Sequence, residues 1–121
     1  MARKDELGRA GEQLAAEHLT AAGYSILERN WRCAIGEIDI VAQQGSTTVV
    51  VEVKTRSGVG FGHPLDAVTP RKLARLRRLA GAWCEANPSL AERGAQGLRI
   101  DVIGVVAGRD GMTIDHLEQV C

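Results

Sequence analysis

Aromatic side chains are scarce in this 121-residue chain, which has two Trp, one Tyr and one Phe. Proteins that bind single strands by stacking bases depend on such side chains, so stacking is not expected to be the main device here. Long apolar runs are also absent, since none approaches the ~20 residues of a membrane-spanning helix. The N-terminus has no apolar stretch typical of a signal peptide. We therefore expect no membrane contact.

Cysteine is also sparse, with single residues at positions 33, 84 and 121. The number is odd, the three are far apart, and none forms a CxxC pair. This pattern argues against a disulfide framework and against a structural zinc site. It fits a protein of the reducing cytoplasm.

Length and composition indicate one globular domain over residues 1–121. Hydrophobic residues make up 45% and charged residues 25% of the chain, which excludes a disordered protein. A chain of this size can bury a core without disulfides or metals.

Charge is balanced overall but not along the chain. Lys+Arg and Asp+Glu both number 15. Residues 54–78 nevertheless contain seven basic residues and one acidic residue, Asp66, whereas the segments on either side are acidic. A zero net charge therefore does not exclude nucleic acid, because the local surface is what meets the phosphates.

Hydrophobic periodicity and turn residues predict an α/β fold with the order α-β-β-β-α-β(-β). The pattern predicts a helix over 5–22, a second helix that begins at Thr69-Pro70 and ends at Asn87-Pro88, and a fourth strand over 98–106. The first three strands are expected at 24–30, 35–43 and 47–54, the last two as a hairpin, and an edge strand at 112–118. Residues 57–64 form a glycine-rich loop that does not fit GxGxxG, and 89–97 form a polar connection.

The residues most suited to chemistry lie on the predicted hairpin. Alternation puts Glu52 and Lys54 on one face of their strand, and the neighbouring strand offers Asp39. Two converging carboxylates are ligands that Mg²⁺ accepts together with water and phosphate. The metal would lower the pKa of a bound water, and Lys54 would orient that water or contact the phosphate. Glu12, on the first helix, is expected to hold a second metal or an outer water.

An ordinary structural explanation competes with this one. Alternation also puts Ile38 and Ile40 on one face of their strand and Glu37, Asp39 and Val41 on the other. The acids and Lys54 would then form cross-strand ion pairs on a solvated face. On the residues alone this explanation is the stronger.

Several motifs change that balance. Five segments resemble the bacterial YraN-like family. They are Gly11-Glu12, the segment from Gly23 to Arg32, Gly36-Glu37-Ile38-Asp39, Val51-Glu52-Val53-Lys54-Thr55-Arg56 and Arg99-Ile100-Asp101-Val102. The likeness runs across almost the whole chain. That family is similar to the PD-(D/E)XK nucleases, and among them to the archaeal Holliday junction resolvases.

The resemblance implies a restriction endonuclease-like core with a central mixed sheet flanked by helices. It also implies a Mg²⁺ or Mn²⁺ site made by Glu12, Asp39, Glu52 and Lys54, and DNA as the substrate. Ile38 stands where the superfamily often has Pro. Because that Pro is not a ligand, the departure leaves the predicted site intact. A fold of this kind can still host a pure binding function.

Further candidate residues lie near the predicted metal site in the sequence or in the expected fold. The candidates for phosphate binding are Arg56, Arg71, Lys72, Arg75 and Arg78, although a basic helix face can equally be a solvated surface. Glu37 is the substitute if the metal ligands are misassigned, and Asp101 is a secondary candidate from the fourth strand. His18 lies on the apolar helix face and is expected to be a core residue.

Three hypotheses follow. The first is a Mg²⁺-dependent endonuclease-like protein that cleaves DNA, including branched recombination or repair intermediates. The second is a nucleic-acid-binding protein of the same fold without turnover. The third is a protein-interaction module whose basic helix binds an acidic partner. A protein that acts on a junction needs two symmetric sites, so a homodimer would favour the first.

Overall fold

The chain folds as an α/β protein in which helices cover a sheet of five strands. The computed structural model describes residues 3–58, 62–93 and 97–120. Its elements are α1 (Arg3–Ala21), β1 (Ser25–Cys33), β2 (Gly36–Gln44), β3 (Thr47–Arg56), η1 (Pro64–Ala67), α2 (Pro70–Ala86), α3 (Pro88–Arg93), β4 (Gly97–Gly108) and β5 (Gly111–Leu117). The predicted α-β-β-β-α-β-β order is confirmed.

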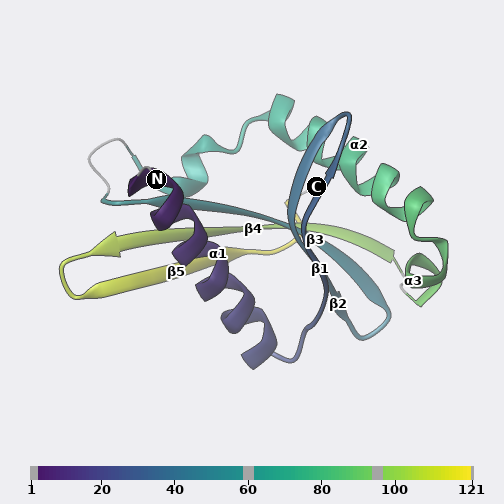
Figure 1. Ribbon diagram of the computed structural model, residues 1–121, viewed down its shortest axis with the longest axis horizontal. Coiled ribbons are helices and arrows are strands. Elements are labelled where there is room, and N and C mark those ends of the chain that lie inside the picture. The colour runs from purple at the N-terminus through teal and green to yellow at the C-terminus, as the bar shows by residue number, and fades with distance from the viewer. Residues whose placement is uncertain (1–2, 59–61, 94–96, 121) are drawn as a thin grey trace.

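The sheet is mixed, as expected. Its strands lie in sequence order, β1-β2-β3-β4-β5. Neighbours are antiparallel except for β3 and β4, which are parallel and are joined through η1, α2 and α3. Figure 1 shows α1 lying across one side of the sheet, whereas α2 and α3 lie next to each other and away from α1.

Two apolar clusters cover the two faces of the sheet. On one face α1 supplies Ala15 and Leu19, which pack with Val49 and Val51 of β3. On the other face the α2 residues Leu76, Leu79, Ala80 and Trp83 pack with Ile38, Val41, Val50 and Ile100 of the sheet. The side chains of β3 therefore alternate between an α1 side and an α2 side.

Strand β2 does not alternate regularly, and here one prediction is wrong. Ile38 packs on the α2 side and Ile40 on the α1 side, so the two do not share a face. The pairing of β2 with β3 runs from Gln44 to Ile40 and stops there, while β1 pairs with β2 up to Gly36. The strand thus leaves β3 at Asp39, and the departure interrupts its alternation.

Helix α1 approaches β3 closely at one glycine. A Cβ built on Gly11 would lie 2.0 Å from the Thr55 Oγ1 atom, so no side chain fits there. Gly11 lets the helix backbone rest on the end of β3. The next residue, Glu12, is thereby held at the same end of the sheet.

Two short helices were not predicted. The first, η1, begins at Pro64, the last residue of the expected loop 57–64, and is capped by His63. The His63 ring Nδ1 accepts from the Leu65 N–H at 3.1 Å, and Asp66 accepts from the His63 N–H at 3.2 Å. The expected polar connection 89–97 holds α3, which begins at Pro88, a residue suited to the first helical position. Residues 59–61 and 94–96 of these two segments lie outside the described residues.

Candidate functional site

Asp39 lies where β2 separates from β3. Its Oδ2 accepts a hydrogen bond of 2.8 Å from the backbone N–H of Val53. The β2–β3 ladder ends at the Ile40–Val51 pair, so the Asp39 carboxylate accepts from this N–H just beyond the end of the ladder. The carboxyl group is thus fixed by the backbone of the strand that also holds Glu52 and Lys54.

The carboxyl groups of Asp39 and Glu52 are in hydrogen-bonding contact. Burial, the negative charge of Glu52 and this hydrogen bond together raise the pKa of Asp39 to about 8, although the Val53 N–H acts in the opposite direction. Like charges this close do not ionise together readily, so Asp39 tends to keep its proton near neutral pH in the metal-free protein. A half-buried acid with a strongly raised pKa is typical of functional sites.

Glu12 approaches the pair from α1. Burial raises its pKa, the charges of Glu37 and Glu52 raise it further, and Arg29 lowers it. Its charge is also felt by Asp39. In the part of the chain that the structure describes, however, no three His, Cys, Asp or Glu side chains group closely enough to hold a metal ion. The third carboxylate of the expected metal site therefore stays a prediction.

The donors present fit a hard cation even without Glu12. Mg²⁺ is often bound by one or two carboxylates, with water and substrate phosphate filling its other positions. Asp39 and Glu52 supply two carboxylates in contact, fixed on adjacent strands. This donor set suits Mg²⁺ or Mn²⁺ and does not suit a softer metal that prefers thiolate or imidazole.

Lys54 shares the α2 side of β3 with Glu52, as predicted, because Val51 and Val53 face α1. Its neighbour on β4 is Gly104. A Cβ at Gly104 would lie 3.2 Å from Pro64, so the missing side chain makes room for η1. Lys54 thus lies on the face of the sheet that η1 and α2 cover.

Arg56 is the last residue of β3 and lies on the same side of the strand as Glu52 and Lys54. Its Nε atom is buried and has no hydrogen-bond partner within the described residues. A buried guanidinium nitrogen without an acceptor is uncommon and needs an explanation, such as an ion or water. Its place two residues beyond Lys54 agrees with the predicted role in binding phosphate.

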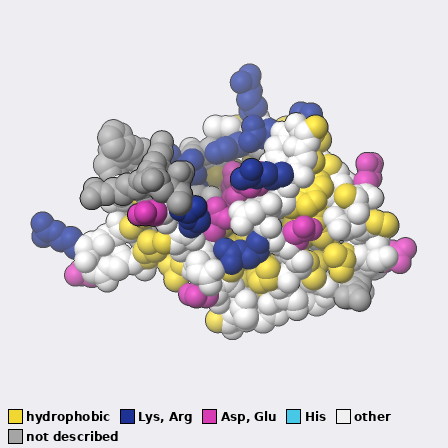
Figure 2. Space-filling view, viewed as in Figure 1, with side chains coloured by type: hydrophobic (Ala, Val, Ile, Leu, Met, Phe, Trp, Pro, Cys, Tyr) yellow, Lys and Arg dark blue, Asp and Glu magenta, His cyan; other side chains and the backbone are white. Residues whose placement is uncertain are grey.

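The basic residues of α2 divide into two groups. Arg71, Arg75 and Arg78 are exposed, whereas Lys72 is half-buried and its Nζ lies 3.9 Å from Glu52 Oε2. Figure 2 shows acidic side chains in the middle of one face of the molecule with Lys and Arg side chains around them. The structure thus brings the basic helix to the carboxylate pair, as the expected nucleic-acid surface requires.

The two secondary candidates are placed differently. Glu37 accepts a 2.8 Å hydrogen bond from Arg32 Nε and lies close enough to Glu12 to affect its charge. Asp101 is neighbour to Val51, on the α1 side, and is fully buried. Asp101 therefore faces away from Glu52 and Lys54 and does not join the carboxylate pair.

Asp101 instead anchors a polar network that sequence reasoning missed. It forms hydrogen bonds of 2.9 Å to Arg99 Nε and 2.8 Å to His116 Nε2, and it accepts from the Gln119 N–H. Burial acts to raise the pKa of Asp101, but these hydrogen bonds outweigh burial and lower it. The alternation of Arg99 and Asp101 along one strand was the available signal for a same-face ion pair.

His18 joins this network through the other ring nitrogen of His116, at 3.2 Å. His18 is half-buried and lies at the edge of the core, so the expectation that it is a core residue is met only in part. Burial lowers the pKa of His18, and the neighbouring His116 lowers it further. A neutral His18 imidazole is thus favoured, and the network is a structural feature of the α1 side.

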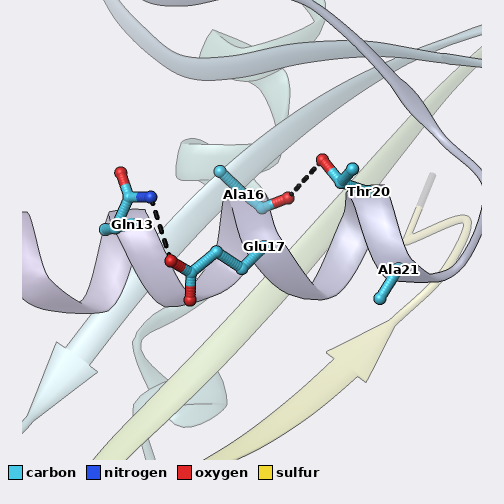
Figure 3. Close-up of a pocket in the computed structure, with 5 residues that line it drawn as sticks. All are labelled: Gln13, Ala16, Glu17, Thr20 and Ala21. Atoms are coloured by element: carbon cyan, nitrogen blue, oxygen red, sulfur yellow. Dashed lines mark hydrogen bonds between the residues drawn. The ribbon is translucent and has the colours of Figure 1, made fainter.

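One surface depression lies on α1. It has a volume of about 350 Å³ and is lined by Gln13, Ala16, Glu17, Thr20 and Ala21. Figure 3 shows two hydrogen bonds within the helix, from Gln13 to Glu17 and from Thr20 to the Ala16 carbonyl, and Gln13 also accepts one from Arg29 of β1. No residue of the carboxylate pair lines it, so the candidate site is elsewhere.

Comparison with known proteins places the chain in a family. The model of the uncharacterised protein family UPF0102 matches residues 11–105. The chain belongs to the UPF0102 family. The YraN-like resemblance is thereby confirmed, and the matched segment includes Glu12, Asp39, Glu52 and Lys54.

Relatives within UPF0102 are similar over nearly their whole length. A UPF0102 protein of Clavibacter michiganensis is 52% identical over 122 residues, with all of both chains covered. One from Leifsonia xyli is 57% identical over 106 residues, covering 88% of this chain and 86% of the relative. Among solved structures, Pyrococcus furiosus SfsA in complex with Ca²⁺ aligns with a TM-score of 0.42 and 19% identity. That alignment covers 95% of this chain but only 63% of SfsA.

The described helices of this UPF0102 protein include none that combines the length and apolar character needed to cross a membrane.

Proposed function

We propose that this UPF0102 protein is a Mg²⁺-dependent endonuclease-like protein that hydrolyses phosphodiester bonds in DNA. The observation that carries the proposal is the half-buried contact between Asp39 and Glu52, with Lys54 on the same side of the sheet as Glu52. Burial and repulsion by the Glu52 charge together raise the pKa of Asp39 to about 8. Such repulsion is relieved when a cation binds, which favours a metal-binding role over a structural one.

The residues of the chain take separate roles in this proposal. Asp39 and Glu52 hold the cation, and Glu12 holds an outer water. When bound, Mg²⁺ supplies positive charge to the phosphate and a water of lowered pKa. Lys54 orients the attacking water or contacts the phosphate that is cleaved. Val53 keeps Asp39 in place through its backbone N–H.

The basic residues hold the nucleic acid. Arg71, Arg75 and Arg78 are exposed on α2, whose Lys72 contacts Glu52, so their guanidinium groups can bind phosphates around the bond that is cleaved. Arg56, with its unpartnered Nε, is suited to a phosphate next to Lys54. Branched intermediates are the proposed substrates, and a homodimer would present the two sites that a symmetric junction requires.

A second function is favoured by one observation. The described residues hold two carboxylates in contact and not three, and Lys72 already neutralises Glu52 in part. This arrangement also suits a protein that binds nucleic acid of the same kind without cleaving it. In that case neutral substitutions at Asp39 and Glu52 would leave DNA affinity unchanged or raise it.

Cleavage of labelled DNA distinguishes the nuclease from the binding protein that does not cleave. The substrates are a four-way junction, a flap, a linear duplex and a single strand, each with Mg²⁺ or Mn²⁺. Asp39→Ala and Lys54→Ala proteins purified in parallel detect contaminating nucleases. Metal-dependent cleavage by the wild type alone supports the nuclease. Salt-sensitive binding without cleavage supports the binding protein, and no binding leaves a module that recognises an acidic protein.

A further inference from the structure

Lys72 differs from the other cations of α2 in what it contacts. Its Nζ lies 3.9 Å from Glu52 Oε2, and the two side chains are 32% and 17% exposed. Arg71, Arg75 and Arg78 are exposed on the same helix. The first turn of α2 therefore places one ammonium group beside the carboxylate pair, while the exposed arginines remain accessible to solvent.

The helix cap fixes this position. Thr69 is the N-cap of α2, and its Oγ1 accepts a 3.2 Å hydrogen bond from the Lys72 N–H. Leu76 packs one turn later on the α2 side of the sheet and holds the helix against β2 and β3. The capped first turn thus directs the Lys72 side chain toward Glu52 of β3.

An ammonium group and a divalent cation compete for the same carboxylate. Both are attracted to Glu52, and each repels the other, most strongly where the side chains are shielded from water. Glu12 adds negative charge near Glu52. Lys72 therefore offsets part of the repulsion among these acids when no metal is bound, and it opposes the cation that would replace it.

We propose that Lys72 is a positioning residue of the carboxylate site and not part of the nucleic-acid-binding surface of α2. It neutralises Glu52 in the metal-free protein and competes with a divalent cation for that side chain. This inference rests on the proposed function, because it assumes that Asp39 and Glu52 bind the cation. It reassigns one residue that sequence reasoning placed among the phosphate contacts.

Mn²⁺ binding to the full-length protein, measured by titration calorimetry without DNA, tests the inference. Lys72→Gln removes the competing charge and should tighten Mn²⁺ binding about tenfold. Lys72→Arg keeps the charge and should bind Mn²⁺ with nearly the wild-type affinity. Arg77→Gln removes an equal charge from the exposed surface of the same helix and should leave Mn²⁺ affinity unchanged. Thermal unfolding of each variant establishes that it is folded.

Results that contradict the inference can be told apart from results that contradict the proposed function. If Lys72→Gln binds Mn²⁺ no more tightly than the wild type, or if Arg77→Gln tightens binding equally, the inference is overturned while the proposed function stands. If Lys72→Arg behaves like Lys72→Gln, competition by charge is overturned. A wild-type protein that binds no Mn²⁺ overturns both the inference and the proposed metal site.

Discussion

Asp39 accepts a hydrogen bond from the backbone N–H of Val53, with 2.8 Å between the two atoms, where β2 leaves β3. This bond places the Asp39 carboxyl group on the strand that holds Glu52, and the two carboxyl groups then meet. The local break in the ladder therefore creates the acidic pair.

The acidic pair should make stability fall as pH rises. Asp39 has a pKa of about 8 in the folded protein against 3.8 for the unperturbed group, so the folded state binds its proton more tightly than the unfolded state. Wild-type stability should then decline between pH 4 and pH 8, by at most ~1.4 kcal/mol per pH unit from this one group. Asp39→Asn keeps an acceptor for Val53 and loses the titrating proton.

Urea unfolding of both proteins at several pH values checks this. Asp39→Asn should gain stability over the wild type as pH rises toward 8, and the difference should shrink near pH 4. A difference that is constant across this range, or that shrinks as pH rises, would show that Asp39 is not a buried acid with a raised pKa.

The approach of α1 to β3 predicts opposite effects at two glycines of one helix. Gly11→Ala forces a Cβ to within 2.0 Å of Thr55 Oγ1, whereas a Cβ at Gly8 meets no atom within 4 Å. Gly11→Ala should lower the free energy of unfolding by about 1–3 kcal/mol because the contact is overpacked. Gly8→Ala should raise it by about 0.5–1 kcal/mol through helix propensity. Chemical denaturation measures both.

The double variant Gly11→Ala/Thr55→Ala removes the Oγ1 atom that causes the closest overlap. It should recover part of the stability that Gly11→Ala loses relative to Thr55→Ala alone. Equal effects at positions 8 and 11 would contradict the close helix–strand contact.

Asp101 should matter for stability and not for the chemistry of the site. It is fully buried and receives hydrogen bonds from Arg99, His116 and the Gln119 N–H. Asp101→Ala leaves the half-buried Arg99 without its main carboxylate and should cost about 3–5 kcal/mol. The exposed Glu85 of α2 offers a control, since Glu85→Ala should change stability by about 0.5 kcal/mol or less.

Urea unfolding again gives the measurement, and DNA binding by the folded fraction supplies the second readout. An Asp101→Ala protein as stable as the wild type would mean that the hydrogen bonds of Asp101 to Arg99, His116 and the Gln119 N–H do not stabilise the fold. Lost DNA binding in a fully folded Asp101→Ala protein would return this residue to the functional site.

The exposed arginines of α2 should control the salt dependence of DNA binding. Each phosphate contact contributes about −0.9 to the slope of log K against log salt concentration. Arg75→Gln and Arg78→Gln, measured by fluorescence anisotropy, should each reduce the magnitude of that slope by about this amount. Arg109→Gln, in the exposed turn between β4 and β5, provides a matched control and should not change it. Slopes that do not differ would mean that these arginines do not contact phosphates, and an absence of salt-dependent DNA binding would favour the acidic-protein partner.

Much of this molecule could be predicted from the sequence because its signals are local. The apolar period of α1, the Thr69-Pro70 start of α2 and the valine-rich β3 each specify their element without reference to the rest of the chain. Alternation alone places Glu52 and Lys54 on one side of β3. The parallel pairing of β3 with β4 also agrees with the mixed sheet that the family resemblance implied.

What could not be predicted depends on contacts between distant segments. The break of β2 at Asp39 becomes visible only when β3 lies beside it, so the faces of Ile38 and Ile40 were misassigned. The contact of Lys72 with Glu52 requires α2 to dock on the sheet. The network of Asp101 with His116 likewise joins two strands whose register no local pattern specifies.

The most direct test of the central claim is single-turnover cleavage of a labelled four-way junction in Mg²⁺. Wild-type protein is compared with Glu52→Gln and with Glu85→Gln, which removes an acidic charge from the exposed end of α2. We predict metal-dependent cleavage by the wild type and by Glu85→Gln, and a rate lower by at least about 100-fold for Glu52→Gln, the scale of a lost catalytic group. Equal cleavage by all three proteins, or none by a wild-type protein that binds the junction, would contradict the claim that the Asp39–Glu52 pair is a nuclease site.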